Sequence, residues 1–402
     1  MLTHRVKILC CWREAIIACC GLIVLQSTVS AIAHEAANAV QQNQIAKGRV
    51  RDKWNLTVPV TVAGRNYSFI VDTGCSSTAF GFNFRRALWP PVCRAVYQTT
   101  HTTQDVELFK ALPIRIGGTD VHTNELVPCL RLTALSLEAN QDIDGILGVD
   151  VLRQFVLDIN FDNDEFSITR HHECDASFSM LRIDSTSDYG CPHLPVKVNG
   201  ASSANLLVDT GCGNNGSICK RFNEQSQNAD ANEALDDGVT FEVSRNVRAS
   251  RVLIGKLEIG PFEHKRMKMF VADELSKIGL PVLYRYHAVF DFPNSRAYLK
   301  KGRHYADGPN WLTCGIRFER EGGETLVVAE VDDGGIGQRH GLMRNDRLLE
   351  VDGKPYGFGQ LFNCVGSSKS SGELKIERDG KLLIVPFSKG GGGEAPDAAC
   401  GR

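Results

Sequence analysis

The sequence has no excess of charge of either sign. It contains 45 lysines and arginines against 47 aspartates and glutamates, and its formal net charge is −2. A basic surface would be expected of a protein that binds nucleic acid or an anionic membrane. The charge balance therefore gives no reason to expect either partner.

The sequence also lacks a long hydrophobic run. The apolar run at 15–25 is shorter than the roughly 20 residues that a helix needs to span a bilayer. Basic residues precede this run and the small residues 31–33 follow it, as in a secretory signal. Residues 1–33 are therefore predicted to be a signal peptide, and the protein to be exported to the periplasm, the cell envelope or the outside. An uncleaved leader that anchors the chain in a membrane is the less favoured alternative.

Patterns typical of metal sites and of nucleophile triads are scarce. His171 to Cys174 puts four potential ligands side by side, but adjacent residues rarely converge on one ion and no partner cluster follows. This stretch is therefore interpreted as a solvated linker, and no metal or organic cofactor is predicted. Cys75 and Cys212 have no neighbouring histidine, which disfavours a thiol nucleophile.

What the sequence does contain is a repeated tripeptide. Asp72-Thr73-Gly74 and Asp209-Thr210-Gly211 each end a hydrophobic, strand-like run, and each is followed by cysteine. Average residue usage predicts about 0.1 copies of such a tripeptide in a chain of this length. A short alternating strand and a polar turn precede both copies, so the sequence indicates an internal duplication.

A second pair of matching segments supports the duplication. Segments 145–159 and 278–292 align on Gly148 and Gly279. Each has the pattern of an apolar strand ending at glycine, a short helical turn and a β-rich strand with an acidic residue. The pattern predicts two mostly β halves, 48–170 and 191–301, joined by a linker at 171–190. One polar, helix-like stretch at 221–235 is either an exposed helix or a loop.

Two carboxylates held together can perform acid–base chemistry. Like charges a few ångströms apart cannot both ionise easily, so one carboxyl keeps a proton and serves as acid while the other serves as base. In each tripeptide the glycine lets backbone amides approach the carboxylate, and the threonine hydroxyl can bond across to the other copy. Asp72 and Asp209 are therefore the candidate catalytic residues.

These motifs resemble those of the retroviral-type and pepsin-type aspartic proteases over about residues 50 to 300. In that family each lobe supplies one Asp-Thr-Gly, and a later apolar-apolar-Gly crosses beneath it. Gly148 and Gly279 match the crossing glycines, although Lys277 leaves only one apolar position before Gly279. The resemblance implies two compact retroviral-type β-barrel lobes fused in one chain, which would hydrolyse polypeptide substrates as a monomer.

The residue after each tripeptide departs from the family pattern. The family usually has Ser, Thr or Ala where this chain has Cys75 and Cys212. A thiol is a weaker hydrogen-bond donor, so the carboxylates would be less stabilised as anions and the active pH would shift upward. The flap that closes over substrate has no motif, and 97–104 is its candidate by position. A fold that has lost catalysis is the alternative.

A third unit follows at 312–388. Its segment 341–354 resembles the signature of PDZ domains, with Asn345 replacing the usual glycine of a left-handed turn. By that similarity Gly315, Ile316, Arg317 and Phe318 would form a loop that binds a peptide C-terminal carboxylate, with the peptide added as an edge strand. The alternative is a module that only packs against the rest of the chain or binds an internal segment of it. The glycine-rich tail 389–402 should be disordered.

Two further expectations concern cysteines and function. Cys174 and Cys191, near the two ends of the linker, are the preferred disulfide pair. The favoured function is an aspartic endopeptidase. Its competitors are an inactive protease-fold scaffold that acts through the PDZ-like unit and a structural envelope protein.

Overall fold

A computed structural model describes residues 43–51, 55–132, 135–136, 141–186, 190–200, 202–225, 232–242, 245–306, 316–321, 325–331, 336–355 and 371–388. The predicted signal peptide, the C-terminal tail and Gly315 lie outside these residues. Among the described residues, no helix is long and apolar enough to cross a membrane.

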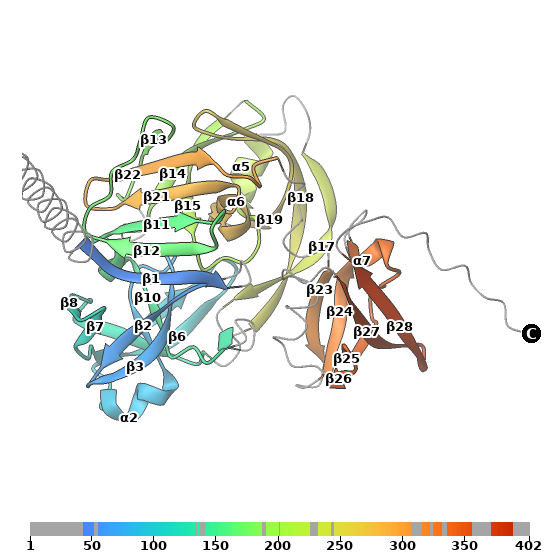
Figure 1. Cartoon of the computed structure of the whole chain (residues 1–402), viewed down its shortest axis with the longest axis horizontal. Coiled ribbons are helices and arrows are strands. Elements are labelled where there is room, and N and C mark those ends of the chain that lie inside the picture. Colours follow the sequence, from blue (N-terminus) through green and yellow to red (C-terminus); the bar gives the residue numbers. More distant parts are fainter. Residues whose placement is uncertain are drawn as a thin grey trace, which may run out of the picture. The chain divides into compact units, whose positions relative to one another are not determined.

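The first half consists mainly of short strands (Figure 1). Its elements are β1 (Gln44–Arg51), β2 (Asn55–Val62), β3 (Arg65–Val71), β4 (Ala79–Gly81), η1 (Phe82–Phe84), α2 (Arg85–Leu88), β5 (Cys93–Gln98), β6 (Thr103–Lys110), β7 (Ile114–Ile116), β8 (Thr119–Val121), β9 (Leu126–Leu130), β10 (Gly145–Leu147), α4 (Val149–Leu152), β11 (Val156–Asn160) and β12 (Glu165–Thr169).

The second half repeats much of this order. Its elements are β13 (Ser179–Arg182), β14 (His193–Val198), β15 (Ser202–Asp209), β16 (Gly216–Cys219), α5 (Lys220–Gln225), β17 (Glu233–Glu242), β18 (Arg245–Ile259), β19 (Phe262–Ala272), β20 (Lys277–Gly279), α6 (Leu280–Leu283), β21 (Tyr286–Asp291) and β22 (Arg296–Lys301). The strand–turn–strand segments predicted around Gly148 and Gly279 are confirmed, as β10–α4–β11 and β20–α6–β21.

Each half begins with a tight hairpin that leads into its Asp-Thr-Gly. Strand β2 pairs with β3 around Ala63-Gly64, and β14 pairs with β15 around Asn199-Gly200. All four turn residues have positive φ, as a two-residue hairpin turn of this kind requires. In both hairpins the apolar side chains of the strands face the core, so the aspartate comes directly after a buried strand.

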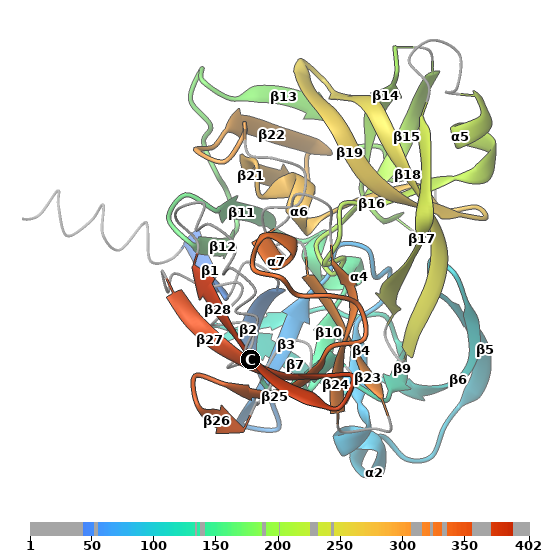
Figure 2. The same cartoon turned by 90° about the vertical axis from the view of Figure 1, so that its right-hand side faces the viewer.

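A parallel crossing strand then passes beside each aspartate strand. β10 pairs in parallel with β3 (Figure 2), and β20 pairs in parallel with β15. In the second half an additional pairing between β14 and β18 closes the path β14-β15-β20-β16-β19-β18 into a barrel. The described part of the chain is therefore mainly β, as predicted.

One sheet joins the two halves. Strand β11 of the first half pairs antiparallel with β21 of the second, in the order β13-β22-β21-β11-β12-β1. Leu157 and Phe290 face each other across this pairing and are almost completely buried. Continuous backbone hydrogen bonds and buried apolar side chains thus hold the equivalent strands of the two halves together.

Three expectations about local structure need correction. The stretch 171–190 is not only a linker, because its residues Ser179–Arg182 form β13 against β22. The stretch 221–235, interpreted as an exposed helix or a loop, is helical only to Gln225 among the described residues, and residues 233–235 pair with β18. Cys174 is a free thiol, so the expected disulfide to Cys191 is wrong.

The third unit is a separate antiparallel sheet. It contains β23 (Ile316–Glu321), β24 (Thr325–Val331), α7 (Ile336–Arg339), β25 (Arg347–Val351), β26 (Lys354–Pro355), β27 (Ser371–Arg378) and β28 (Lys381–Ser388). The strand order is β23-β24-β25-β27-β28, with β26 beside β25. The predicted hairpin around Asp379-Gly380 is confirmed by the β27–β28 pairing and by positive φ at both turn residues.

Candidate active site

The two aspartates occupy equivalent places at the ends of β3 and β15. Backbone N–H of Asp72 donates to Leu147 O at 3.1 Å, which ties the first aspartate to its crossing strand. Asp209 lies opposite Gly279 in the parallel β15–β20 pairing. In both halves the crossing strand therefore fixes where the aspartate leaves its strand.

The two threonines bond across from one half to the other. Thr73 Oγ1 donates to Val208 O at 2.6 Å, and Thr210 Oγ1 donates to Val71 O at 2.8 Å. Each threonine N–H also donates to the other threonine's Oγ1 at 3.0 Å. Both side chains are fully buried, so these four bonds hold the two turns against each other without competition from water.

The glycines of the tripeptides show how closely the carboxylates approach. A Cβ added to Gly74 would lie 2.5 Å from Cγ of Asp209, and one added to Gly211 would lie 2.5 Å from Oδ2 of Asp72. Both distances are shorter than any real Cβ contact, so only glycine allows the opposite carboxylate to lie there. Each glycine N–H also donates to the aspartate of its own half, at 2.8 Å to Asp72 and 2.9 Å to Asp209.

Gly148 and Gly279 lie against the turns that follow the tripeptides. A Cβ at Gly148 would meet the backbone carbon of Ser77 at 2.6 Å, and one at Gly279 would meet Asn214 O at 1.9 Å. The residues that follow these glycines donate their backbone N–H groups to the carbonyls of Cys75 and Cys212, at 2.8 and 2.9 Å. The crossing glycines thus allow the main-chain contact that supports each aspartate turn.

The first aspartate strongly favours its protonated form. Burial and the negative charge of Asp209 raise the pKa of Asp72 from 3.8 to about 8, and the Gly74 N–H and Lys277 only partly oppose this. Around neutral pH the pair therefore holds one proton and one negative charge. This is the state in which one carboxyl can donate a proton while the other accepts one.

Sequence reasoning missed one functional group at this site, the side chain of Lys277. Its ammonium donates to Asp209 Oδ2 at 2.9 Å. The lysine and aspartate side chains are only 14% and 11% exposed. In the sequence Lys277 weakened the match to the crossing motif, and its polarity at an otherwise apolar position was the signal that could have identified it.

The cysteines after the tripeptides are buried and neutral. Burial, followed by the charge of Asp72, raises the pKa of Cys75 to about 12, and burial raises that of Cys212 to about 11. Cys75 Sγ donates to Ser77 O and contacts Tyr97 Oη at 3.4 Å, while Cys212 Sγ contacts Asn214. The thiols therefore bond to neighbouring turns and do not act as thiolates.

The segment 97–104, which position alone suggested as the flap, contains the turn of the β5–β6 hairpin. Tyr97 contacts Cys75 beneath the first aspartate, and its pKa is raised well above 10 by burial and by nearby groups that include Cys75 and Asp72. At the turn, the ring of His101 lies 6.5 Å from that of Phe270 in β19, measured between centroids. The hairpin thus extends from the first aspartate to the second half.

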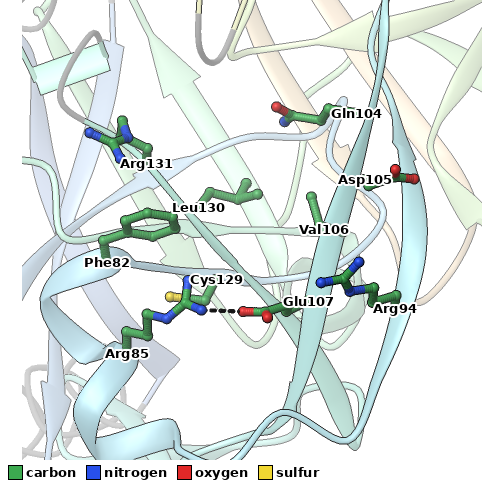
Figure 3. Close-up of a pocket in the computed structure, with 10 residues that line it drawn as sticks. All are labelled: Phe82, Arg85, Arg94, Gln104, Asp105, Val106, Glu107, Cys129, Leu130 and Arg131. Carbon is green, nitrogen blue, oxygen red and sulfur yellow. Dashed lines mark hydrogen bonds and ion pairs between the residues drawn. The ribbon is translucent and has the colours of Figure 1, made fainter.

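A separate cavity of about 430 Å³ lies in the first half (Figure 3). Arg85 and Arg131 lie over the ring of Phe82 beside it, and Arg85 donates to Glu107. Neither catalytic candidate lines this cavity.

The residues expected to form the carboxylate-binding loop of the third unit are only partly described. Gly315 lies outside the described residues. Ile316, Arg317 and Phe318 belong to strand β23 rather than to a loop, because Ile316 pairs with Val331 and its side chain is buried in the core of this unit. A register shift between Arg317 and Phe318 interrupts the pairing with β24.

Comparisons with known proteins agree with the first of the two motifs. Residues 58–151 match the family model described as aspartyl protease. Among solved structures, the chain is similar to the aspartic proteinase from Irpex lacteus, with 16% identity and a TM-score of 0.39, over 66% of this chain and 100% of that chain. No curated protein matches the chain.

Proposed function

We propose that this protein is an aspartic endopeptidase with two acid-protease lobes, which hydrolyses peptide bonds of polypeptide substrates. The observation that carries the proposal is the pairing of Asp72 with Asp209 through the crossed threonine bonds. The family match of residues 58–151 supports the same activity. Because both aspartates come from one chain, the active form proposed is a monomer.

In the proposed reaction one carboxylate removes a proton from water as the water oxygen attacks the peptide carbonyl carbon. The other carboxyl gives its proton to the carbonyl oxygen, which forms a tetrahedral diol. The first carboxyl then protonates the amide nitrogen as the C–N bond breaks, and a diol hydroxyl returns a proton to the second. One carboxylic acid and one amine result, and the pair regains its starting protonation.

The decisive experiment compares the protein with its Asp72→Asn and Asp209→Asn variants. Purified protein is incubated with an unfolded polypeptide between pH 3 and 8, and the new amino termini are counted. Each variant should lose cleavage by at least about 100-fold, because each removes one partner of the acid–base step. Asp120→Asn, an exposed carboxylate of the same chemistry, serves as the matched control and should cleave normally.

The outcomes separate the competing functions. Equal cleavage by the protein and both variants would refute the catalytic assignment. No cleavage by any of them, combined with tight binding of unfolded polypeptide, would favour the inactive scaffold. A peptide-mimic inhibitor carrying a hydroxyl in place of the scissile carbonyl should raise the melting temperature if the aspartate site binds substrate, and no change would favour a structural role.

For the third unit we propose a PDZ-like module that binds the C-terminus of a peptide along β23. This strand ends the described sheet order, with β24 as its neighbour on one side. Asn345 adopts φ 72°, the left-handed conformation that the signature turn requires. Peptides with free apolar C-termini should bind the full chain, and the same peptides amidated should not. Equal binding of both forms would overturn this proposal.

For localisation we propose export by cleavage of the leader 1–33. Sequencing the amino terminus of the protein isolated from its host should find the chain starting soon after residue 33. A protein that retains the leader in the membrane fraction would instead support the anchored alternative.

A further inference from the structure

Lys277 occupies a position that is apolar in the other half. In the parallel pairing of β20 with β15, Lys277 lies opposite Leu207. The same register in the first half places Ile146 opposite Ile70. The two crossing strands are otherwise built alike, so the duplicated site has a cation on the Asp209 side and a hydrocarbon side chain on the Asp72 side.

This cation lies in an enclosed environment and bonds directly to the dyad. Lys277 Nζ is 2.9 Å from Asp209 Oδ2, and both side chains are largely shielded from solvent. Burial alone would favour the neutral amine, but the attraction of Asp209 outweighs it and the pKa of Lys277 is raised above its ordinary value. The ammonium therefore stays charged, and an enclosed ammonium requires a compensating anion.

Asp209 is the carboxylate that supplies this anion. Asp72 accepts a backbone N–H from Gly74, as Asp209 does from Gly211, so the backbone donors are balanced between the two halves. The ion pair is the feature that distinguishes the two carboxyls. Burial and the charge of Asp209 accordingly raise the pKa of Asp72 to about 8.

The other titratable groups that bear on the dyad are neutral. Burial raises the pKa values of Cys75, Cys212 and Tyr97, which keeps both thiols and the phenol protonated near neutral pH. The charge distribution at the site is thus governed by Asp72, Asp209 and Lys277.

We propose that Lys277 is a positioning residue that holds the negative charge on Asp209 and leaves the shared proton on Asp72. This inference rests on the proposed function and assigns the base and acid roles to the two aspartates. Asp209 receives the proton of the attacking water, and Asp72 donates its proton to the substrate carbonyl oxygen. Without the ammonium, the negative charge on Asp209 would have no opposite charge beside it in this enclosed environment.

The test uses three substitutions at Lys277. Lys277→Met keeps the length of the side chain without its charge, Lys277→Arg keeps the charge, and Lys277→Ile copies the equivalent residue of the first half. Lys220→Met, which removes an exposed lysine paired with Asp273, is the matched control. The measured quantity is kcat/KM as a function of pH.

Lys277→Met and Lys277→Ile should move the acidic limb of the profile upward by about 1 to 3 pH units, the usual effect of an adjacent opposite charge on a carboxyl pKa. The alkaline limb should rise less, because Lys277 bonds to Asp209 and only lowers the pKa of Asp72 from a distance. Lys277→Arg and Lys220→Met should leave the acidic limb in place. An acidic limb that stays fixed in Lys277→Met, or moves equally in Lys277→Arg, would overturn the inference.

A second measurement does not depend on cleavage. Carboxyl carbons of aspartate are labelled with ¹³C, and the two dyad signals are assigned by comparison with Asp72→Asn and Asp209→Asn. In the unsubstituted protein the proton should lie on Asp72, which titrates near 8, and the negative charge on Asp209. This spectrum remains informative if a Lys277 variant fails to fold. The expected titration without any cleavage would refute the proposed function alone, whereas the reverse assignment of proton and charge would refute the inference alone.

Discussion

Thr73 and Thr210 form a reciprocal pair in which each backbone N–H donates to the other's Oγ1 at 3.0 Å. Each hydroxyl in turn donates to a backbone carbonyl that precedes the opposite aspartate. A displacement of one turn would therefore break bonds on both sides. The geometry of the aspartates depends on this pair as much as on the strands that lead to them.

Replacing either threonine should affect stability and activity together. Thr73→Val keeps the shape of the side chain but leaves the buried N–H of Thr210 and the carbonyl of Val208 without their partner. We expect a loss of about 1–3 kcal/mol in the free energy of unfolding, measured in urea, and a fall in kcat/KM. Thr73→Ser, which restores the hydroxyl, should recover most of both. A valine variant as stable as the original would contradict this role for the bonds.

Stability should fall as pH rises, because of Asp72. Its pKa of about 8 in the folded protein exceeds the ordinary 3.8 of an unfolded chain, so the folded state binds the proton more tightly. This contribution is fully present below pH 4 and is lost as pH rises through about 8, with a slope of at most about 1.4 kcal/mol per pH unit. Urea unfolding at pH 5 and pH 8 should show a smaller decline in Asp72→Asn than in the unsubstituted protein. Equal declines in both proteins would mean that Asp72 titrates with an ordinary pKa.

Adding a methyl group at either tripeptide glycine should separate the carboxylates. In Gly74→Ala the new Cβ would have to displace Asp209, whose Cγ lies 2.5 Å away, and in Gly211→Ala it would displace Asp72. Because a small misplacement of catalytic groups is costly, we expect kcat/KM to fall by about 100-fold or more. Circular dichroism should show a retained β fold. Normal activity in both variants would show that the carboxylates act from another arrangement.

The repeated pattern of the sequence was sufficient to predict the elements that carry the aspartates. Strand alternation, the Ala63-Gly64 and Asn199-Gly200 turns and the two crossing glycines are local features, and local features determine the hairpins and the β10–α4–β11 and β20–α6–β21 segments. The threonine bonds between the halves followed from the same duplication. In these segments the secondary structure that the local sequence favours agrees with the contacts in the folded protein.

What the sequence could not reveal depends on contacts between distant segments. In the sequence Lys277 was only a departure from the apolar pattern of the crossing motif. Its contact with Asp209 depends on the parallel register of β20 with β15, which the sequence does not give. Residues 233–235 continued a polar, helix-like stretch, but hydrogen bonding to β18 makes them a strand. Cys174 and Cys191 were paired from their order in the chain alone, which does not give the distance between two thiols.

A buried ion pair in the third unit offers a test that leaves the aspartate site untouched. Asp346 is completely buried and accepts hydrogen bonds from Arg378 Nε at 2.6 Å and Nη2 at 2.7 Å, and from Met343 N. Asp346→Asn should destabilise this unit by about 1–3 kcal/mol, because the buried amide nitrogen of asparagine would face one of these donors in place of a carboxylate oxygen. Glu350→Gln, which removes a more exposed partner of Lys375, is the control and should cost less than about 1 kcal/mol. Hydrogen exchange of β25 and β27 measures both effects, and equal protection in the two variants would contradict the assigned role.

Thiol chemistry gives a further test of which groups act on the substrate. Cys75 and Cys212 are buried and their pKa values are raised to about 12 and about 11, so at pH 7 neither is a thiolate. Iodoacetamide reacts with thiolates, and it should therefore modify the exposed Cys93 before Cys75 or Cys212, while cleavage of polypeptide continues. Mass spectrometry locates the modified residues and a peptide assay follows the activity. Cys75→Ser should also retain cleavage, because its hydroxyl can replace the thiol donor to Ser77 O. Rapid inactivation by iodoacetamide with modification of Cys75 or Cys212, together with an inactive serine variant, would assign the chemistry to a thiol instead of the two carboxyls.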